Sequence, residues 1–441
     1  MASTNPGPED RGVATTEVTP EIQTEEAAVA PGASPELLAG SVGEYARIWF
    51  QRMRSGESGA VPVILGLIVV ILFFQIKNSL FLSAGNLVNL LTQAAFIITL
   101  AMAEVFVLLL GEIDLAAGFT AACGAVIALW LLALNWPWPV AVLVALAATG
   151  AYGALQGFII TWLRLPSFVV TLAGFLGLSG VLLFLINATG SIGTGGVIRL
   201  QSNVINDIEN GALSPAASWI VMIAVVALAG LIMFLGDRRR RVNGLVAPPV
   251  SITLLKIAVI AVAGVAVVLV GNINRGSVLL AVSGLPWVVL VVLAVLVVYT
   301  VLLGRTRLGR YVYAIGGNAE AARRAGVNTN RIRVAAFALC GLTAGITGII
   351  YASYLGSISS GVNGGQNVLY AVAAAVIGGT SLFGGRGKML DAVLGGLVVG
   401  VIANGLQLIG LTAAAQLIWT ALVLLAAVAV DSLTRRGQRS G

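Results

Sequence analysis

Repeated apolar runs constrain the fold of this chain more than any other feature. Most of them are long enough to cross the roughly 30 Å of hydrocarbon in a bilayer at about 1.5 Å per helical residue. The tenth run is short and rich in glycine, which favours a half-helix or re-entrant piece over a full span. We read twelve such segments: 60–76, 87–110, 115–134, 138–161, 167–187, 216–235, 251–271, 286–304, 335–356, 369–383, 392–411 and 414–432. The pattern predicts an all-α polytopic membrane protein with 10–12 true spans.

Composition excludes several kinds of chemistry. The chain has no histidine, which removes histidine-based acid–base catalysis and histidine-ligated metal sites. Cys123 and Cys340 lie inside apolar runs, where we expect small core residues. The stretch GGRGKM at 384–389 lacks the first glycine and the final serine or threonine of a phosphate-binding loop. We therefore expect no catalytic residue, metal, cofactor or nucleic-acid partner.

The basic residues indicate the orientation in the membrane. If the N-terminus lies in the cytoplasm and the spans alternate, Lys77, Arg199 and Arg275 fall outside and the other 22 of the 25 basic residues fall inside or at inner helix ends. Basic residues near span ends set orientation, so we expect both termini to be cytoplasmic. Residues 1–44 carry eight acids and one arginine and should form a disordered tail. The predicted organisation is a tail, acidic then basic, at 1–55, a permease domain at 56–434 and a basic cytoplasmic tail at 435–441.

A polar block at 305–334 interrupts the apolar pattern on the predicted cytoplasmic side. Within it, Asn318 can cap a short helix, Glu320 lies in the first turn and Gly326 can end it. The sequence therefore predicts a compact helix at 319–326 outside the bilayer. A plain solvated loop is the alternative.

Amide side chains mark one face of the second span. Asn86, Asn89 and Gln93 follow i, i+3, i+7 spacing, and Glu104 returns to the same face five turns later. Such a stripe suits a helix that lines a solute path with polar ends and a closed waist. Asn404 and Gln407 repeat the pattern on the eleventh span. Hydrogen bonding within the outer interface is the other interpretation of these amides.

Two acids, Glu112 and Asp114, fall in the break between the second and third spans. Asp114 can cap the third span, and both can also contact solute or take part in gating. Glycines recur at helical spacing within three spans, which predicts close helix packing. They are Gly174, Gly177 and Gly180, then Gly341, Gly345 and Gly348, and finally Gly396 and Gly400.

Several motifs resemble one family. Glu320-Ala321-Ala322 followed by Arg323 and Gly326 is similar to the EAA-xxx-G loop of permeases in ATP-binding-cassette importers. LLLGEIDLAAG at 108–118 resembles the signature of ribose/xylose-type sugar permeases, with Ala116 where serine is usual. The blocks NLVNLLTQAAF, LPSFVVTLAG at 165–174 and the run at 376–411 are also similar to that branch. Together they cover roughly 60–433, and Glu112 favours the xylose-type subgroup.

The resemblance implies a permease that pairs with a second copy in the inner membrane of a prokaryote. A separate cassette ATPase would dock on the helix containing Glu320, and a sugar-binding protein would dock outside. The cargo would be a monosaccharide, with a pentose such as xylose first. Another sugar, a nucleoside or a branched-chain amino acid are alternatives, and so is an ion-coupled secondary transporter that uses Glu104, Glu112 and Asp114.

Overall fold

The computed structural model describes residues 43, 47, 61–188, 196–244, 247–276, 282–412, 414–422 and 425. The predicted tails at 1–55 and 435–441 lie, apart from residues 43 and 47, outside this part of the chain, as do residues 423, 424 and 426–432 of the last apolar segment. The described elements are α2 (Val61–Lys77), α3 (Ala84–Leu108), α4 (Ala117–Ala133), α5 (Trp138–Leu163), α6 (Ser167–Ala188), β1 (Val197–Arg199), α7 (Asn203–Asn210), α8 (Pro215–Val242), α9 (Val250–Asn272), α10 (Trp287–Arg305), α11 (Arg307–Gly317), α12 (Ala319–Arg324), α13 (Thr329–Leu355), β2 (Ser357–Ser359), α14 (Gly364–Gly378) and α15 (Met389–Leu408).

The helices confirm a polytopic helical membrane protein. Among the described residues, eight helices are long and apolar enough to cross a membrane: α3, α5, α6, α8, α9, α10, α13 and α15. Three apolar helices, α2, α4 and α14, are shorter, with 10–17 residues. The 15-residue α14 corresponds to the tenth apolar run. At about 1.5 Å per residue it falls short of the hydrocarbon thickness, as its glycine content predicts.

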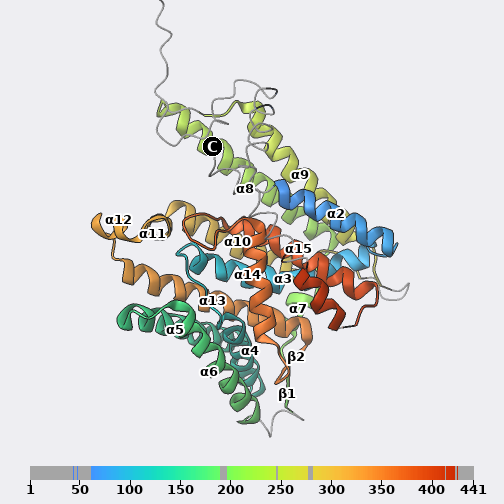
Figure 1. The fold of residues 1–441 in the computed structure, drawn as a ribbon. Helices are drawn as coiled ribbons and strands as arrows, with labels where there is room; N and C mark the ends of the chain where they lie inside the picture. Colours follow the sequence, from blue (N-terminus) through green and yellow to red (C-terminus); the bar gives the residue numbers. More distant parts are fainter. Residues whose placement is uncertain are drawn as a thin grey trace, which may run out of the picture.

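The centre of the bundle is α3, which packs against α13, α15, α14 and α10 (Figure 1). In its apolar window 83% of the residues are buried, far more than in the outer helices. The largest apolar cluster joins α3, α13 and α14, with Phe106, Phe337 and Leu108 among its fully buried members. The amide-bearing second span of the sequence is therefore an interior helix.

Glycines allow α13 to lie directly against α5. A Cβ on Gly153 of α5 would collide with the Phe337 carbonyl, and a Cβ on Gly341 of α13 would collide with the Thr149 carbonyl. Gly345 of α13 is also tight against α5, Gly348 is tight against Ala121 of α4, and Gly396 and Gly400 of α15 are tight against α3. The packing prediction is confirmed for these glycines and for Gly174. It is wrong for Gly177 and Gly180, around which the described residues leave open space.

The helix ends gather on two sides of the bundle. Gly157 near the end of α5 touches Val334 at the start of α13, and Gly385 donates its N–H to the Leu109 carbonyl at 2.9 Å. We call this side the basic end, because Arg164, Arg305, Arg307, Arg310, Arg331, Arg333, Arg386 and Lys388 belong to the segments that meet there. The opposite end carries β1 paired with β2, and α7. The basic residues thus cluster on one side, as orientation by charge requires.

The short helix α7 is fixed to the end of α13. The Glu209 N–H donates to Ser353 Oγ at 3.1 Å, and Asn210 Nδ2 donates to the Ser353 carbonyl at 2.9 Å. The side chain of Glu209 is only 5% exposed, and burial raises its pKa to about 9. Its carboxyl is therefore neutral near neutral pH, which lets α7 pack on the bundle without burying a charge. Neither α7 nor the β1–β2 pair was predicted from the sequence.

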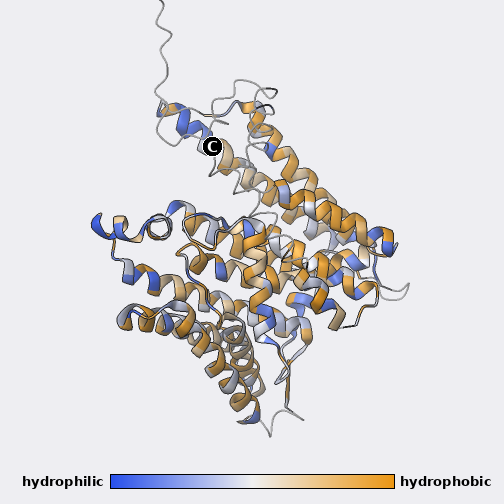
Figure 2. Cartoon of the chain, in the orientation of Figure 1, coloured by the Kyte–Doolittle hydropathy of each residue, from blue (hydrophilic) through white to orange (hydrophobic). Residues whose placement is uncertain are grey.

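Helices α8 and α9 form a hairpin that projects from the rest of the bundle (Figure 1). They pack mainly on each other, and only 6% of the apolar window of α8 and 17% of that of α9 is buried. Figure 2 shows mostly hydrophobic residues along the hairpin and a hydrophilic stretch at the last turns of α8. An apolar surface this exposed is the kind that lipid tails cover in a membrane.

The close contact between α5 and α13 can be tested with one glycine. Gly153→Val should lower the apparent melting temperature of the purified protein, because Cβ atoms do not fit against the Phe337 backbone. Overpacking of this kind costs about 1–3 kcal/mol. Gly177→Val on α6 is the matched control, since its surroundings are open. Equal melting temperatures for the two variants would contradict the packing account.

Candidate functional site

The amides predicted on two distant spans meet in one hydrogen-bonded chain. Asn86 Nδ2 donates to Asn404 Oδ1 at 2.9 Å, and Asn404 Nδ2 donates to Gln93 Oε1 at 3.1 Å. Gln93 Nε2 then donates to Gln407 Oε1 at 3.3 Å. We call these four side chains the amide chain. It joins α3 to α15 toward the end of the bundle opposite the basic end.

Burial differs along the amide chain. Asn404 is 2% exposed, so its hydrogen bonds replace those that water would otherwise make. Gln407, the last side chain of the amide chain, is exposed. Asn89, on the same helix, is also exposed, and only its backbone carbonyl bonds locally, to the Thr92 hydroxyl. The structure therefore joins Asn86 and Gln93 to α15 and leaves Asn89 beside the chain rather than in it.

An aromatic group that the sequence analysis missed lies farther along α3. The ring of Phe96 is 4.8 Å from that of Tyr351 and 6.3 Å from that of Tyr354, measured between centroids. Phe96, Tyr351 and Asn367 line a cavity of about 10 Å³, which is room for about one water. Next to it on α14, Gln366 Nε2 donates to the Tyr370 hydroxyl at 2.6 Å. Aromatic rings and amides are the groups that bind sugars, and the i, i+3 tyrosines of α13 were the available signal.

The acids Glu104 and Asp114 form a second, fully buried group. Asp114 Oδ1 accepts from the Ala116 N–H at 3.0 Å and from Gln156 Nε2 at 3.5 Å, and Cys340 Sγ donates to its Oδ2 at 3.7 Å. Glu104 Oε2 accepts from the Asp114 N–H at 3.5 Å, and Glu104 Oε1 has no partner. Both acids are 0% exposed. Glu104 is therefore not part of the amide chain, because its carboxylate accepts from the break at 109–116 instead.

The proposed capping role of Asp114 is also corrected. Helix α4 has Ala116 as its N-cap residue, and no side chain caps it. Asp114 lies two residues earlier and closes a local turn through the Ala116 N–H. Its side chain holds the break between α3 and α4 against α5 and α13. This position makes it a structural link between three helices.

Glu112 pairs with a cation at the basic end. Its Oε1 lies 2.9 Å from Arg333 Nε near the start of α13, although the N–H is not aligned for a hydrogen bond. The side chain of Glu112 is 10% exposed and that of Arg333 is 32% exposed. A partly buried ion pair of this kind ties the break after α3 to α13. The structure thus places Glu112 away from the amide chain.

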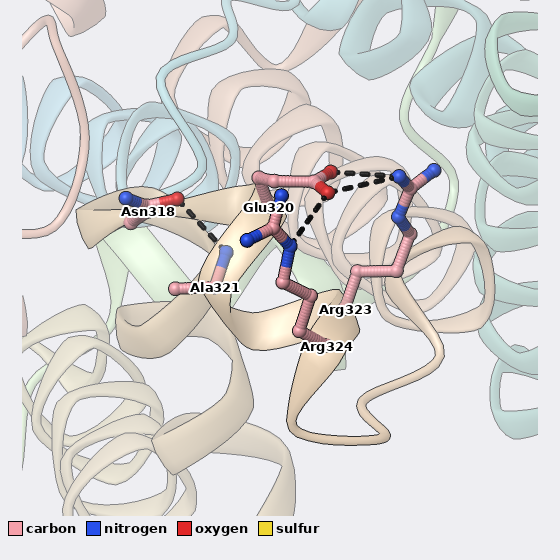
Figure 3. A network of polar contacts seen from close by, with 5 residues as sticks. All are labelled: Asn318, Glu320, Ala321, Arg323 and Arg324. Atoms are coloured by element: carbon pink, nitrogen blue, oxygen red, sulfur yellow. Dashed lines mark hydrogen bonds and ion pairs between the residues drawn. The ribbon is translucent and has the colours of Figure 1, made fainter.

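The predicted short helix is present as α12. Asn318 Oδ1 accepts from the Ala321 N–H at 2.9 Å, and Glu320 pairs with Arg323 at 2.8 Å and Arg324 at 3.1 Å (Figure 3). Gly326 follows with a φ of 85°, the left-handed conformation that ends helices. Ala322 is buried against the bundle, whereas Glu320, Arg323 and Arg324 are exposed. The helix ends at Arg324, two residues before the predicted boundary.

An amphipathic helix, α11, connects α12 to the bundle, and the sequence analysis did not anticipate it. A Cβ on Gly316 of α11 would collide with the Leu109 carbonyl, and the Tyr313 hydroxyl donates to the Gly387 carbonyl at 2.7 Å. Leu109 directly follows α3, and Gly387 directly precedes Lys388, the N-cap residue of α15. Helix α11 therefore contacts the ends of the two helices that carry the amide chain.

Comparison with known proteins identifies the family. A family model described as branched-chain amino acid transport system / permease component matches residues 86–236 and 187–428. The chain is 34% identical to the xylose transport system permease protein XylH of Escherichia coli K12 over 390 residues, which is 88% of this chain and 95% of that protein. It is 33% identical to XylH of Haemophilus influenzae, over 87% of this chain and 99% of the relative.

The ribose import permease protein RbsC of Escherichia coli K12 is 29% identical over 88% of this chain and 96% of its own length. No solved structure matches this chain. Each of these relatives is named as a permease, so the prediction of a transport subunit rather than an enzyme is confirmed. The chain therefore belongs to the permease-component family of these transport systems, and it is a permease of the ribose/xylose type.

Proposed function

We propose that this chain carries a monosaccharide, a pentose such as xylose, across the inner membrane as the permease of an ATP-driven importer. The observation that carries the proposal is the match to two xylose permeases along 87–88% of the chain. The amide chain and the aromatic group support it, because amides bind sugar hydroxyls and rings stack on sugar faces. A pentose is the first expectation because the relatives at 33–34% identity are named for xylose and the one at 29% for ribose.

The proposed path for the sugar follows α3 and α15. The residues proposed to line it are Asn86, Asn89, Gln93, Asn404 and Gln407, and those proposed to guard its inner end are Glu112 and Asp114. Exposed Asn89 and Gln407 would face the centre of a pair of permeases, where a path between two copies would run. Weak contacts suit such a path, since tight binding slows release.

The proposed drive comes from a separate cassette ATPase that docks on α12. The residues proposed to make the docking contact are Glu320, Ala321, Ala322 and Arg323 of α12 and Gly326 just after it, with the basic end facing the cytoplasm. Movement of α12 would pass to α11, which contacts Leu109 after α3 and Gly387 before α15. The ATPase would thus act on both helices that carry the amide chain, and a sugar-binding protein would deliver cargo at the opposite end.

Transport by the reconstituted importer tests the cargo. We expect ATP-dependent uptake of labelled xylose into liposomes that contain the permease, its ATPase and its binding protein. Unlabelled xylose should compete best, ribose less, and glucose and leucine least. Better competition by leucine would assign the chain to amino acid transport. Uptake that follows a proton or sodium gradient without ATPase would identify an ion-coupled transporter.

The docking role of α12 can be tested by charge reversal. Glu320→Arg should reduce ATP-dependent uptake by about tenfold or more, because like charges at an interface cost several kcal/mol. Folding should change little, since exposed ion pairs contribute about 1 kcal/mol or less. Glu320→Gln is the control that removes the ion pairs without reversing the charge. Full ATPase capture and uptake by Glu320→Arg would disprove the docking role.

The amide chain makes a separate prediction for transport. Gln93→Ala should slow uptake by about 5- to 10-fold, the effect of about 1 kcal/mol, by removing one amide from the chain. Gln75→Ala is the matched control, because this amide on α2 bonds only to the backbone of Ser79 and Leu82. Uptake is compared at equal amounts of folded protein in the membrane. Equal rates for the two variants would show that the amide chain only joins α3 to α15.

A further inference from the structure

The end of the α8–α9 hairpin holds a cavity that no part of the transport path uses. Its volume is about 230 Å³, and it is lined by Phe234, Asp237, Arg238, Arg241, Val250 and Thr253. It lies where the exposed apolar surface of α8 gives way to four consecutive arginines. Because successive spans cross the membrane in alternating directions, the C-terminal end of α8 falls on the same side as the basic end.

Helical spacing builds one wall of the cavity. Phe234, Asp237, Arg238 and Arg241 stand at i, i+3, i+4 and i+7, so they share one face of α8. Arg239 and Arg240 lie between them in sequence and do not line the cavity. Val250 and Thr253 form the facing wall on α9. Of the four arginines, Arg238 and Arg241 therefore line the cavity, whereas Arg239 and Arg240 do not.

Hydrogen bonds hold both walls in place. Arg241 Nη2 donates to the Pro248 carbonyl at 2.7 Å, which closes the turn between α8 and α9. Thr253 Oγ1 donates to Asp237 Oδ2 at 2.6 Å, which ties the acid in the cavity to α9. With two arginines and one carboxylate, the lining keeps a net positive charge. A guanidinium pair in such a setting binds phosphate oxygens through several parallel hydrogen bonds.

We propose that this cavity binds the phosphodiester headgroup of an anionic phospholipid. The phosphate would lie between Arg238 and Arg241, and the acyl chains would run along the apolar hairpin. Phe234 is 50% exposed and Val250 is 42% exposed, so the cavity opens onto that surface. A soluble phosphate would use only the arginines, whereas a phospholipid also covers the apolar walls. The inner leaflet supplies such lipids at the depth where basic residues collect.

The four arginines provide a matched test. The full-length permease in detergent is titrated with phosphatidylglycerol, and the bound lipid is counted by native mass spectrometry. The wild type and Arg239→Gln/Arg240→Gln should bind alike, whereas Arg238→Gln/Arg241→Gln should bind about 30-fold more weakly, at about 1 kcal/mol per basic residue. The two double variants carry the same net charge on the same helix. Phosphatidylcholine should bind no variant tightly.

Two further measurements separate binding in the cavity from other kinds of binding. Because Arg241 also closes the turn, Arg238→Gln is compared alone with Arg239→Gln, and only the former should weaken binding. Inorganic phosphate at millimolar concentration should not displace the lipid. Equal losses in both double variants would show that diffuse surface charge, not the cavity, binds lipid. Full displacement by phosphate would show a simple anion site, and either result would overturn the proposal.

Discussion

The close backbone contact between α13 and α5 is the constraint on which the rest of the structure depends. Gly153 and Gly341 let the two helices approach until each meets the backbone of the other. Packing at this distance fixes α13 in rotation, because a side chain in place of either glycine would collide. The rotation in turn sets which residues α13 presents to α3, to the break at 109–116 and to α7.

Because α13 is fixed, its polar side chains become anchors for other elements. Arg333 near its start pairs with Glu112, Cys340 in its middle contacts Asp114, and Ser353 near its end holds α7. Each of these partners belongs to a segment too short or too polar to pack by itself. Polar links therefore position the breaks between helices, while apolar packing positions the helices. A transport cycle that moves α3 would have to strain or release these same links.

The sequence predicted the helices well, because a bilayer requires long apolar runs and such runs can be recognised from the sequence alone. It also predicted the start of α12 and, to within two residues, its end, since Asn318 and Gly326 act through local backbone geometry. It could not predict that Glu104 faces Asp114 rather than the amides. Helical spacing gives the face of a residue, whereas the partner on that face depends on which helices are neighbours. The amide chain was found only as two separate stripes for the same reason, and α11 was missed because its apolar face is short.

The positions of α12 and of the α8–α9 hairpin suggest two different roles for arginine. Arg323 and Arg324 stay exposed on α12, where Glu320 partly balances them and a protein partner can reach them. Arg238 and Arg241 line a cavity that opens onto apolar surface, where a lipid fits better than a protein. In the orientation that the charge pattern predicts, both sets lie on the inner side. The two pairs of arginines differ in the surface beside them, which is polar at α12 and apolar at α8. The coupling role proposed for α12 and the lipid site proposed on the hairpin require different partners, and this difference in neighbouring surface is sufficient to select them.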